Sequence, residues 1–194
     1  MTAVRRLYLV RHAGTVATRH AGFPVDEPLG AAGLAAAAKL SALVPPMNES
    51  LCSPTMRARQ TAAAAGWKTV DEWGLRPLDL GVWSGRDLQD VGSTDPAGMV
   101  RWLSDPAARP HGGETVLELI QRIRGLLAQW HEPATSDLVA VTHAAVIRAA
   151  VVVAMDAPAE AFWRVEVSPA SVTELHTRGG GWSLFRANAT ISNT

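Results

Sequence analysis

A buried strand followed directly by a helix is the feature that most constrains the fold of this chain. Residues 137–142 read DLVAVT, a short apolar run whose length is typical of a fully buried strand. Residues 144–154, AAVIRAAVVVA, predict a helix behind it. The apolar stretch from 138 to 155 contains His143 and Arg148, so we interpret it as a strand and a helix rather than a membrane span.

The same alternation of strand and helix runs through the rest of the chain. Leu7–Val10 and Glu49–Ser53 predict two further strands, because each is a compact apolar run that ends at polar residues. Gly30–Leu43 is rich in Ala and Leu and predicts a helix that ends before Pro45-Pro46. Ser53-Pro54 is typical of an N-cap followed by proline at the first helical position, so a second helix is expected from Pro54 to about Ala65.

The second half of the chain combines a long excursion with further helices and terminal strands. Residues 71–95 are rich in Gly, Pro, Trp and Asp and predict a surface segment without regular structure, of the kind that often carries function. The remaining predicted elements are helices at 95–103 and 114–130 and strands at 163–167, 172–176 and 182–186. This order predicts one α/β domain over residues 1–194, a three-layer sandwich whose mostly parallel central sheet is flanked by helices. Residues 71–111 are its expected lid and substrate-specificity segment.

Composition excludes several classes of function. The 194 residues are 47% apolar and 19% charged, which is a globular balance. Lys+Arg and Asp+Glu both number 18, so we expect no broad attraction to nucleic acid or to a membrane surface. Cys52 is the only cysteine and cannot form an intrachain disulfide, and the histidines lack zinc-site spacing. The apolar run near the N-terminus is too short for a signal peptide, so a cytoplasmic protein without a metal or other cofactor is expected.

The tetrapeptide Arg-His-Ala-Gly occurs twice, at residues 11–14 and 19–22, and an arginine beside a histidine could hold and attack a phosphate. The first copy follows a predicted buried strand, which would fix its backbone, whereas the second lies in a segment with Gly22 and Pro24. Because catalysis depends on sub-ångström positioning, we favour the first pair. Ligand sites in α/β sheets lie beyond the carboxyl ends of strands, where His12 and His143 are both expected.

Five motifs occur in the order typical of one enzyme family. They are LYLVRHAGT, DEPLGAAG, CSPTMRARQTA, HGGETVLEL and LVAVTHAAVIR, and together they resemble the histidine phosphatase superfamily of phosphoglycerate-mutase-like proteins. The resemblance implies that fold, and it implies that His12 is a nucleophile that forms a phosphohistidine. It also implies that Arg11 and Arg57 clamp the phosphate oxygens and that His143 donates a hydrogen bond to the transferring group.

The physical chemistry of these residue types agrees with the implied roles. Guanidinium groups bind phosphate oxygens through forked, charge-assisted hydrogen bonds. Arg11 and Arg57 would also disfavour protonation of His12, which must be neutral to attack. The other ring nitrogen of His12 needs an acceptor to fix the tautomer, for which we predict a backbone carbonyl. No metal is required.

The chain departs from the family at its glycines and at its proton donor. Ala13 and the pair Ala144-Ala145 stand where the family usually has glycine, and alanine resists positive φ. Pro77, in LRPLDLGVWSG, stands where the family often has a glutamate that acts as general acid. Proline cannot transfer a proton, so we predict Asp79 as the substitute, with Glu72 and Glu114 as weaker candidates. The alternative is that Asp79 caps a turn.

Four further contacts to substrate are predicted. Thr18 occupies the family's polar phosphate-contact position, six residues after the nucleophile, and the backbone N–H of Ala144 is a second candidate. Glu114, at a predicted helix start, and Trp83, near the expected lid, are candidates for lining the pocket. Stabilising the helix end and packing in the core are the competing interpretations.

The sequence therefore predicts a metal-independent phosphatase that hydrolyses a small phosphorylated metabolite through phospho-His12. Within the family the alternative is a phosphoglycerate-type phosphomutase. Outside enzymatic function the alternative is a weakly active or inactive member that binds phosphorylated ligands or a protein partner. The strands expected between 163 and 186 also offer an edge for a homodimer.

Overall fold

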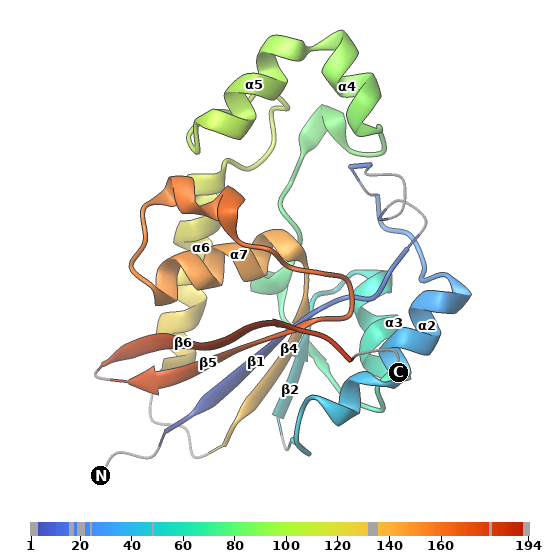
Figure 1. Cartoon of the computed structure of the whole chain (residues 1–194), viewed down its shortest axis with the longest axis vertical. Coiled ribbons are helices and arrows are strands. Elements are labelled where there is room, and N and C mark those ends of the chain that lie inside the picture. Colours follow the sequence, from blue (N-terminus) through green and yellow to red (C-terminus); the bar gives the residue numbers. More distant parts are fainter. Residues whose placement is uncertain are drawn as a thin grey trace.

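A central β-sheet organises the chain (Figure 1). The computed structural model describes residues 4–15, 18, 22–23, 25–47, 49–131, 136–178 and 180–191. Within these residues the sheet has the strand order β3-β2-β4-β1-β5-β6. Its strands are β1 (Arg6–Arg11), β2 (Glu49–Cys52), β3 (Val70–Asp71), β4 (Leu138–Thr142), β5 (Val172–Arg178) and β6 (Gly181–Ala189). The first four in that order pair in parallel and the last two are antiparallel, so the prediction of a mostly parallel sheet is confirmed.

Helices cover both faces of the sheet, which confirms the predicted three layers (Figure 1). Helices α6 (Val116–His131) and α7 (Ala144–Ala154) pack on one face, and α2 (Ala31–Ala38) and α3 (Met56–Ala64) pack on the other. In the described part of the chain, no helix combines the length and the apolar character that crossing a membrane requires.

Strand periodicity divides the core into two clusters. Side chains alternate between the faces of a strand, so neighbouring residues of one strand belong to different layers. Leu7 and Leu9 of β1 join the cluster beneath α6 and α7, whereas Tyr8 and Val10 join the cluster beneath α2 and α3. The central strands are therefore apolar on both sides, as the continuous apolar run of 137–142 predicted.

The excursion contains more regular structure than predicted. Helices α4 (Leu88–Thr94) and α5 (Pro96–Ser104) stand together at the top of the view in Figure 1. The prediction that 71–95 lacks regular structure is therefore wrong for α4. Its N-cap Asp87 accepts a hydrogen bond from the backbone N–H of Asp90, and this capping signal in the sequence was missed.

The strand predicted at 163–167 is also wrong. Ala159–Arg164 forms a 3₁₀ helix, and the residues after it pair with no strand in the described part of the chain. The carbonyl oxygens of Val165 and Val167 instead accept hydrogen bonds from the side chains of Arg148 and Arg11. This segment resembles a strand in composition, but two of its backbone acceptors bind side chains.

Two glycines allow residues 79–82 and residues 111–114 to pass very close to one another. Gly81 has a φ of +46°, and a Cβ at this position would lie 2.0 Å from the carbonyl oxygen of His111. A Cβ on Gly113 would lie 2.2 Å from the carbonyl oxygen of Asp79. Backbone hydrogen bonds join the two segments of this crossing, from Val82 to His111 and from Glu114 to Asp79. The crossing fixes where α4 and α5 leave the body of the protein.

Replacing Gly81 with alanine is expected to lower the free energy of unfolding by at least about 1 kcal/mol, because it adds both backbone strain and a clash. The matched control is Gly125→Ala in α6, where nothing lies within 4 Å of the added Cβ. That control is expected to raise stability by about 0.5–1 kcal/mol, because alanine favours a helix. Urea unfolding followed by tryptophan fluorescence measures both variants. A Gly81→Ala protein as stable as the wild type would contradict the prediction.

Candidate active site

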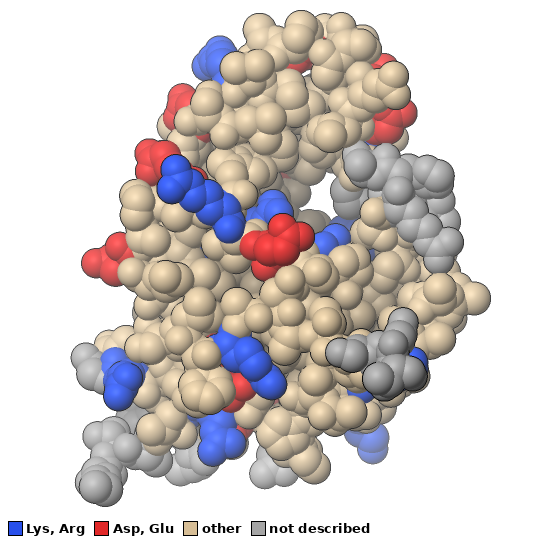
Figure 2. All heavy atoms as spheres, in the orientation of Figure 1, with Lys and Arg blue, Asp and Glu red and all other residues tan. Residues whose placement is uncertain are grey.

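A cavity of about 720 Å³ lies at the carboxyl ends of three parallel strands. His12 follows β1, Ser53 follows β2 and His143 follows β4. Because neighbouring parallel strands end at the same edge of a sheet, these residues meet although they are far apart in the sequence. Figure 2 shows the molecule hollowed between the upper part and the body, with basic side chains inside the hollow.

The cavity gathers most of the residues predicted from the sequence. Its lining includes the following predicted site residues: Arg11, His12, Thr18, Arg57, Asp79, His143 and Ala144. Pro77 and Trp102 contribute walls from the excursion, and Trp163 contributes one from the segment before β5. Arg19 and His20, the second Arg-His pair, lie outside the described residues.

His12 has the tautomer that nucleophilic attack requires. Its side chain is buried, and Nδ1 lies 2.9 Å from the carbonyl oxygen of Ala13. A carbonyl can only accept, so Nδ1 donates and Nε2 carries the lone pair. Burial lowers the pKa of His12 from 6.5 to about 3; the cationic side chains of Arg57 and Arg11 act in the same direction, and the Ala13 carbonyl opposes them. His12 is therefore neutral at physiological pH.

His143 lies beside His12 and contacts Ser53, which the sequence predicted to be a helix N-cap. The ring centroids of the two histidines are 5.1 Å apart, and Ser53 Oγ lies 2.8 Å from His143 Nε2. The N-cap of α3 is Thr55, so Ser53 contacts the histidine rather than capping this helix. Which of the two groups donates depends on which ring nitrogen of His143 carries the hydrogen. Burial, followed by the nearby His12, lowers the pKa of His143 well below 6.5.

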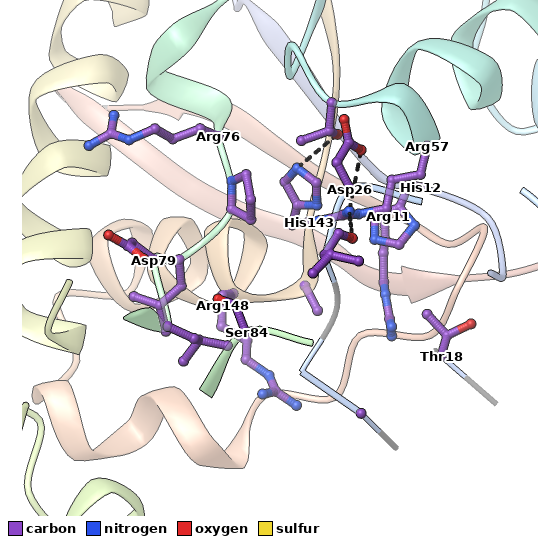
Figure 3. A pocket seen from close by; sticks show the side chains of 18 of the residues that line it. Arg11, His12, Thr18, Asp26, Arg57, Arg76, Asp79, Ser84, His143 and Arg148 are labelled. Carbon is purple, nitrogen blue, oxygen red and sulfur yellow. Dashed lines mark hydrogen bonds and ion pairs between the residues drawn. The ribbon is translucent and has the colours of Figure 1, made fainter. Parts of the chain in front are cut away.

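Two arginines supply positive charge next to the histidines (Figure 3). Arg11 Nη1 donates to the carbonyl oxygen of Val167 at 2.6 Å, and Arg57 Nη1 donates to that of Val25 at 2.7 Å. The Nε atoms of both arginines are buried and have no hydrogen-bond partner among the described residues. Burial lowers the pKa of Arg11 to about 10, so it stays charged at neutral pH. These donors are arranged for an anion.

The alanines that replace the family glycines lie in ordinary backbone conformations. Among the described residues, positive φ at a residue other than glycine occurs only at Asp156, Ala170 and Asn188. Ala144 is the first residue of α7, and no side chain caps this helix terminus. The first N–H groups of a helix have no partner within the helix, so this terminus faces the cavity as a set of free donors.

Two residues predicted to contact substrate lie outside the cavity lining. Trp83 is 1% exposed and packs against Phe23 and Trp102, so it belongs to the core. Glu114 forms an ion pair with Arg122, with 2.7 Å between Oε2 and Nη2. For Trp83 the competing interpretation, packing in the core, describes the contacts that are present. Glu114 instead pairs with a side chain further along α6, and the start of that helix is held by reciprocal hydrogen bonds between Thr115 and Glu118.

Two other predicted residues line the cavity, but their polar groups are already engaged. The hydroxyl of Thr18 donates to the carbonyl oxygen of Thr15 at 2.8 Å, so its single hydrogen is not directed at a phosphate. Asp79 is exposed, and its Oδ1 accepts a hydrogen bond from the backbone N–H of Gly81 at 2.9 Å. Figure 3 shows its carboxylate pointing away from His12 and His143. Asp79 thus makes the turn contact given as the alternative to its role as general acid.

Arg148 and Asp26 line the cavity and were not assigned a role from the sequence. Asp26 Oδ1 lies 3.5 Å from Arg57 Nη1. Arg148 lies one helical turn after Ala144 on the same face of α7, so the spacing of four residues was a signal available in the sequence. In the part of the chain that the structure describes, no group of three or more His, Cys, Asp or Glu side chains is placed to hold a metal ion.

Two neutral histidines, two guanidinium groups and a helix N-terminus define a site for a phosphoryl group. The family model of the histidine phosphatase superfamily (branch 1) matches residues 7–190. The chain therefore belongs to the histidine phosphatase superfamily.

Individual relatives agree with this assignment. The chain is 30% identical to glucosyl-3-phosphoglycerate phosphatase of Mycolicibacterium vanbaalenii over 98% of each sequence. Mycobacterial hydrolase 1 superposes with a TM-score of 0.86 at 24% identity, over 97% of this chain and 100% of that chain. The α-ribazole phosphatase of Shigella flexneri superposes with a TM-score of 0.83 at 24% identity, over 97% of this chain and 100% of that chain. At this identity the two structures establish the fold alone.

The buried histidines predict a loss of stability in acid. Both have a pKa below 6.5 in the folded chain, so the unfolded chain binds more protons below pH 6.5. The free energy of unfolding should therefore fall as the pH drops below 6.5. His12 contributes about 1.4 kcal/mol per pH unit down to about pH 3, and His143 acts in the same direction. His12→Gln removes one contribution and should make the slope shallower by that amount. Urea titrations between about pH 6 and about pH 4 measure it, and an unchanged slope would refute this account of His12.

Proposed function

We propose that this protein hydrolyses small phosphorylated metabolites through a phosphohistidine on His12. The observation that carries the proposal is the hydrogen bond from Nδ1 to the Ala13 carbonyl, which leaves Nε2 as a free nucleophile beside Arg11 and Arg57. A protein that only bound phosphate would not need a neutral histidine fixed in this tautomer. The family to which the chain belongs supports the same reaction class.

In the first step, Nε2 of His12 attacks the phosphorus atom. An N–P bond forms, the P–O bond to the leaving group breaks, and the leaving oxygen departs with the electron pair and takes a proton from solvent water. Arg11, Arg57 and the N-terminus of α7 stabilise the negative charge on the phosphoryl oxygens, and a hydrogen bond from His143 adds to this. The hydrogen on Nδ1 remains on the ring and is shared with the Ala13 carbonyl oxygen.

In the second step, a water molecule attacks the phosphohistidine. A new P–O bond forms, the N–P bond breaks and the electron pair returns to Nε2. The protons of the water leave with inorganic phosphate, and His12 becomes neutral again. No metal takes part in this scheme, because arginine side chains supply the positive charge.

The proton for the leaving group is the weak point of the site. Pro77 lines the cavity where relatives often have a glutamate, and the carboxylate of Asp79 points away from the histidines (Figure 3). Loss of a general acid costs about 10²–10⁴ in rate, and substrates with good leaving groups suffer least. The proposed substrates are therefore phosphate compounds such as aryl phosphates, acyl phosphates and phosphoanhydrides.

We also propose a lid role for residues 71–111, a cytoplasmic location and a homodimer. The excursion supplies Leu78, Leu80 and Trp102 to the cavity walls, which supports its role in substrate choice. Strand β6 ends the sheet, and no described strand covers its outer edge, which supports pairing with a second copy. Sedimentation analysis distinguishes a dimer from a monomer.

His12→Ala is expected to lower the hydrolysis of p-nitrophenyl phosphate by at least about 10³-fold, as loss of a nucleophile typically does. The assay contains a chelator, which tests metal independence at the same time. His20→Ala, in the second Arg-His-Ala-Gly copy, is the matched control and should retain wild-type activity. If the wild type released no phosphate from any phosphomonoester, the enzymatic function would be refuted. The alternative of an inactive protein that binds phosphorylated ligands or a protein partner would then remain.

Pro77→Glu is expected to restore a proton donor. It should raise kcat for alkyl phosphates by about 10-fold or more and leave p-nitrophenyl phosphate nearly unchanged, because only a poor leaving group needs the proton. Pro77→Gln removes the same proline but cannot donate an acidic proton, so it is the control. Equal acceleration of both substrate types, or equal effects of Glu and Gln, would count against a missing acid.

A further inference from the structure

Arg148 places a third guanidinium group in the cavity. It lies on α7 four residues after Ala144, and both residues line the cavity. Residues four apart lie on the same helix face, about 6 Å from one another along the axis. The backbone of Arg148 is therefore about one helical turn from the helix N-terminus that faces the phosphoryl site.

The side chain of Arg148 is fixed in orientation. Its Nε donates to the carbonyl oxygen of Val165 at 3.0 Å, and its Cζ lies 5.8 Å from the ring centroid of Phe162. Phe162 is fully buried, so the guanidinium group rests against a rigid surface. Among the described residues, neither Nη1 nor Nη2 of Arg148 has a hydrogen-bond partner. Figure 3 shows this guanidinium apart from His12 and Arg57.

Two guanidinium groups in the cavity have no carboxylate in contact with them. Asp26 lies near Arg57, but within the described residues neither Arg11 nor Arg148 has a carboxylate within 4.0 Å. Burial lowers the pKa of Arg148, and burial together with repulsion from Arg148 lowers that of Arg11, while Glu166 opposes both shifts. In the proposed mechanism Arg11 and Arg57 contact the transferring phosphoryl group. The guanidinium of Arg148 then still lacks an anion in contact with it.

We propose that Arg148 forms a second anion subsite, which binds a carboxylate or a second phosphoryl group on the part of the substrate that is not transferred. This inference rests on the proposed function and narrows its substrates to metabolites with two anionic groups. Trp102 and Trp163, whose rings are 4.4 Å apart between centroids, line the same cavity. Aromatic walls exclude water and strengthen an ion pair between the second anion and Arg148.

The test compares three ligands as competitive inhibitors of p-nitrophenyl phosphate hydrolysis. Propyl phosphate carries one anionic group, 3-phosphonooxypropanoate adds a carboxylate, and propane-1,3-diol bisphosphate adds a phosphoryl group. For the wild type, at least one of the two doubly anionic ligands should have an inhibition constant at least about tenfold lower than that of propyl phosphate, as expected for a charged hydrogen bond. Which of the two binds more tightly distinguishes a carboxylate from a second phosphoryl group.

The variants then assign this preference to one side chain. Arg148→Met keeps an unbranched side chain over Phe162. It should abolish the preference for doubly anionic ligands and leave the inhibition constant of propyl phosphate within about twofold of the wild-type value. Arg148→Lys keeps the charge and should retain part of the preference. Arg164→Met removes an exposed arginine outside the cavity lining, which controls for net charge, and should behave like the wild type.

Three results would overturn the subsite. The first is a wild type that does not prefer either doubly anionic ligand to propyl phosphate, and the second is a preference that survives in Arg148→Met. The third is equal weakening of all three ligands in Arg148→Met, because the residue would then serve the transferring group or the fold. If the wild type releases no phosphate from p-nitrophenyl phosphate or from any other phosphomonoester, the proposed function fails. Dissociation constants of the same three ligands, measured by calorimetry, then still decide whether the subsite exists.

Discussion

The burial of guanidinium groups beside two neutral histidines is the interaction on which the rest of the structure depends. An ion taken out of water costs several kcal/mol unless polar groups replace its hydration. Here backbone carbonyls take that role, those of Val25 for Arg57 and Val167 for Arg11. A carbonyl dipole holds the side chain and leaves its charge available to a phosphate. Arg57 also has one carboxylate close by, since Asp26 Oδ1 lies 3.5 Å from its Nη1, whereas Arg11 has none within 4.0 Å among the described residues.

The parallel sheet brings this cluster together. Strands β1, β2 and β4 are neighbours and end at one edge, so short polar segments after three separate strands meet there. The helix that follows β4 adds its N-terminus, and its second turn adds Arg148. The positions of the charged groups in the cavity therefore depend on the backbone at these strand ends. Apolar side chains of the strands, packed in the two core clusters, hold that backbone in place.

Sequence patterns placed the candidate site residues at strand ends, where the structure brings them together in one cavity, and failed where a position depends on packing between distant segments. Arg11, His12 and His143 directly follow or end apolar runs, so their convergence could be predicted. The interior position of Trp83 depends on contacts with residues far away in the sequence, and no local pattern reports it. The strand expected at 163–167 failed for the same reason, because the use of its carbonyls by two arginines is a tertiary property.

The alanines and the proline that set this chain apart have different consequences. Ala13 and Ala144 lie outside positive φ, so neither alanine strains the backbone. The N–H of Ala13 donates to Thr61 Oγ1, whereas that of Ala144 belongs to the helix terminus at the cavity. Pro77 removes a functional group that no backbone arrangement can replace. In the proposed mechanism, binding and the attack by His12 are thus separable from protonation of the leaving oxygen. Under that proposal the identity of the leaving group, rather than the strength of the phosphate site, limits which substrates are turned over.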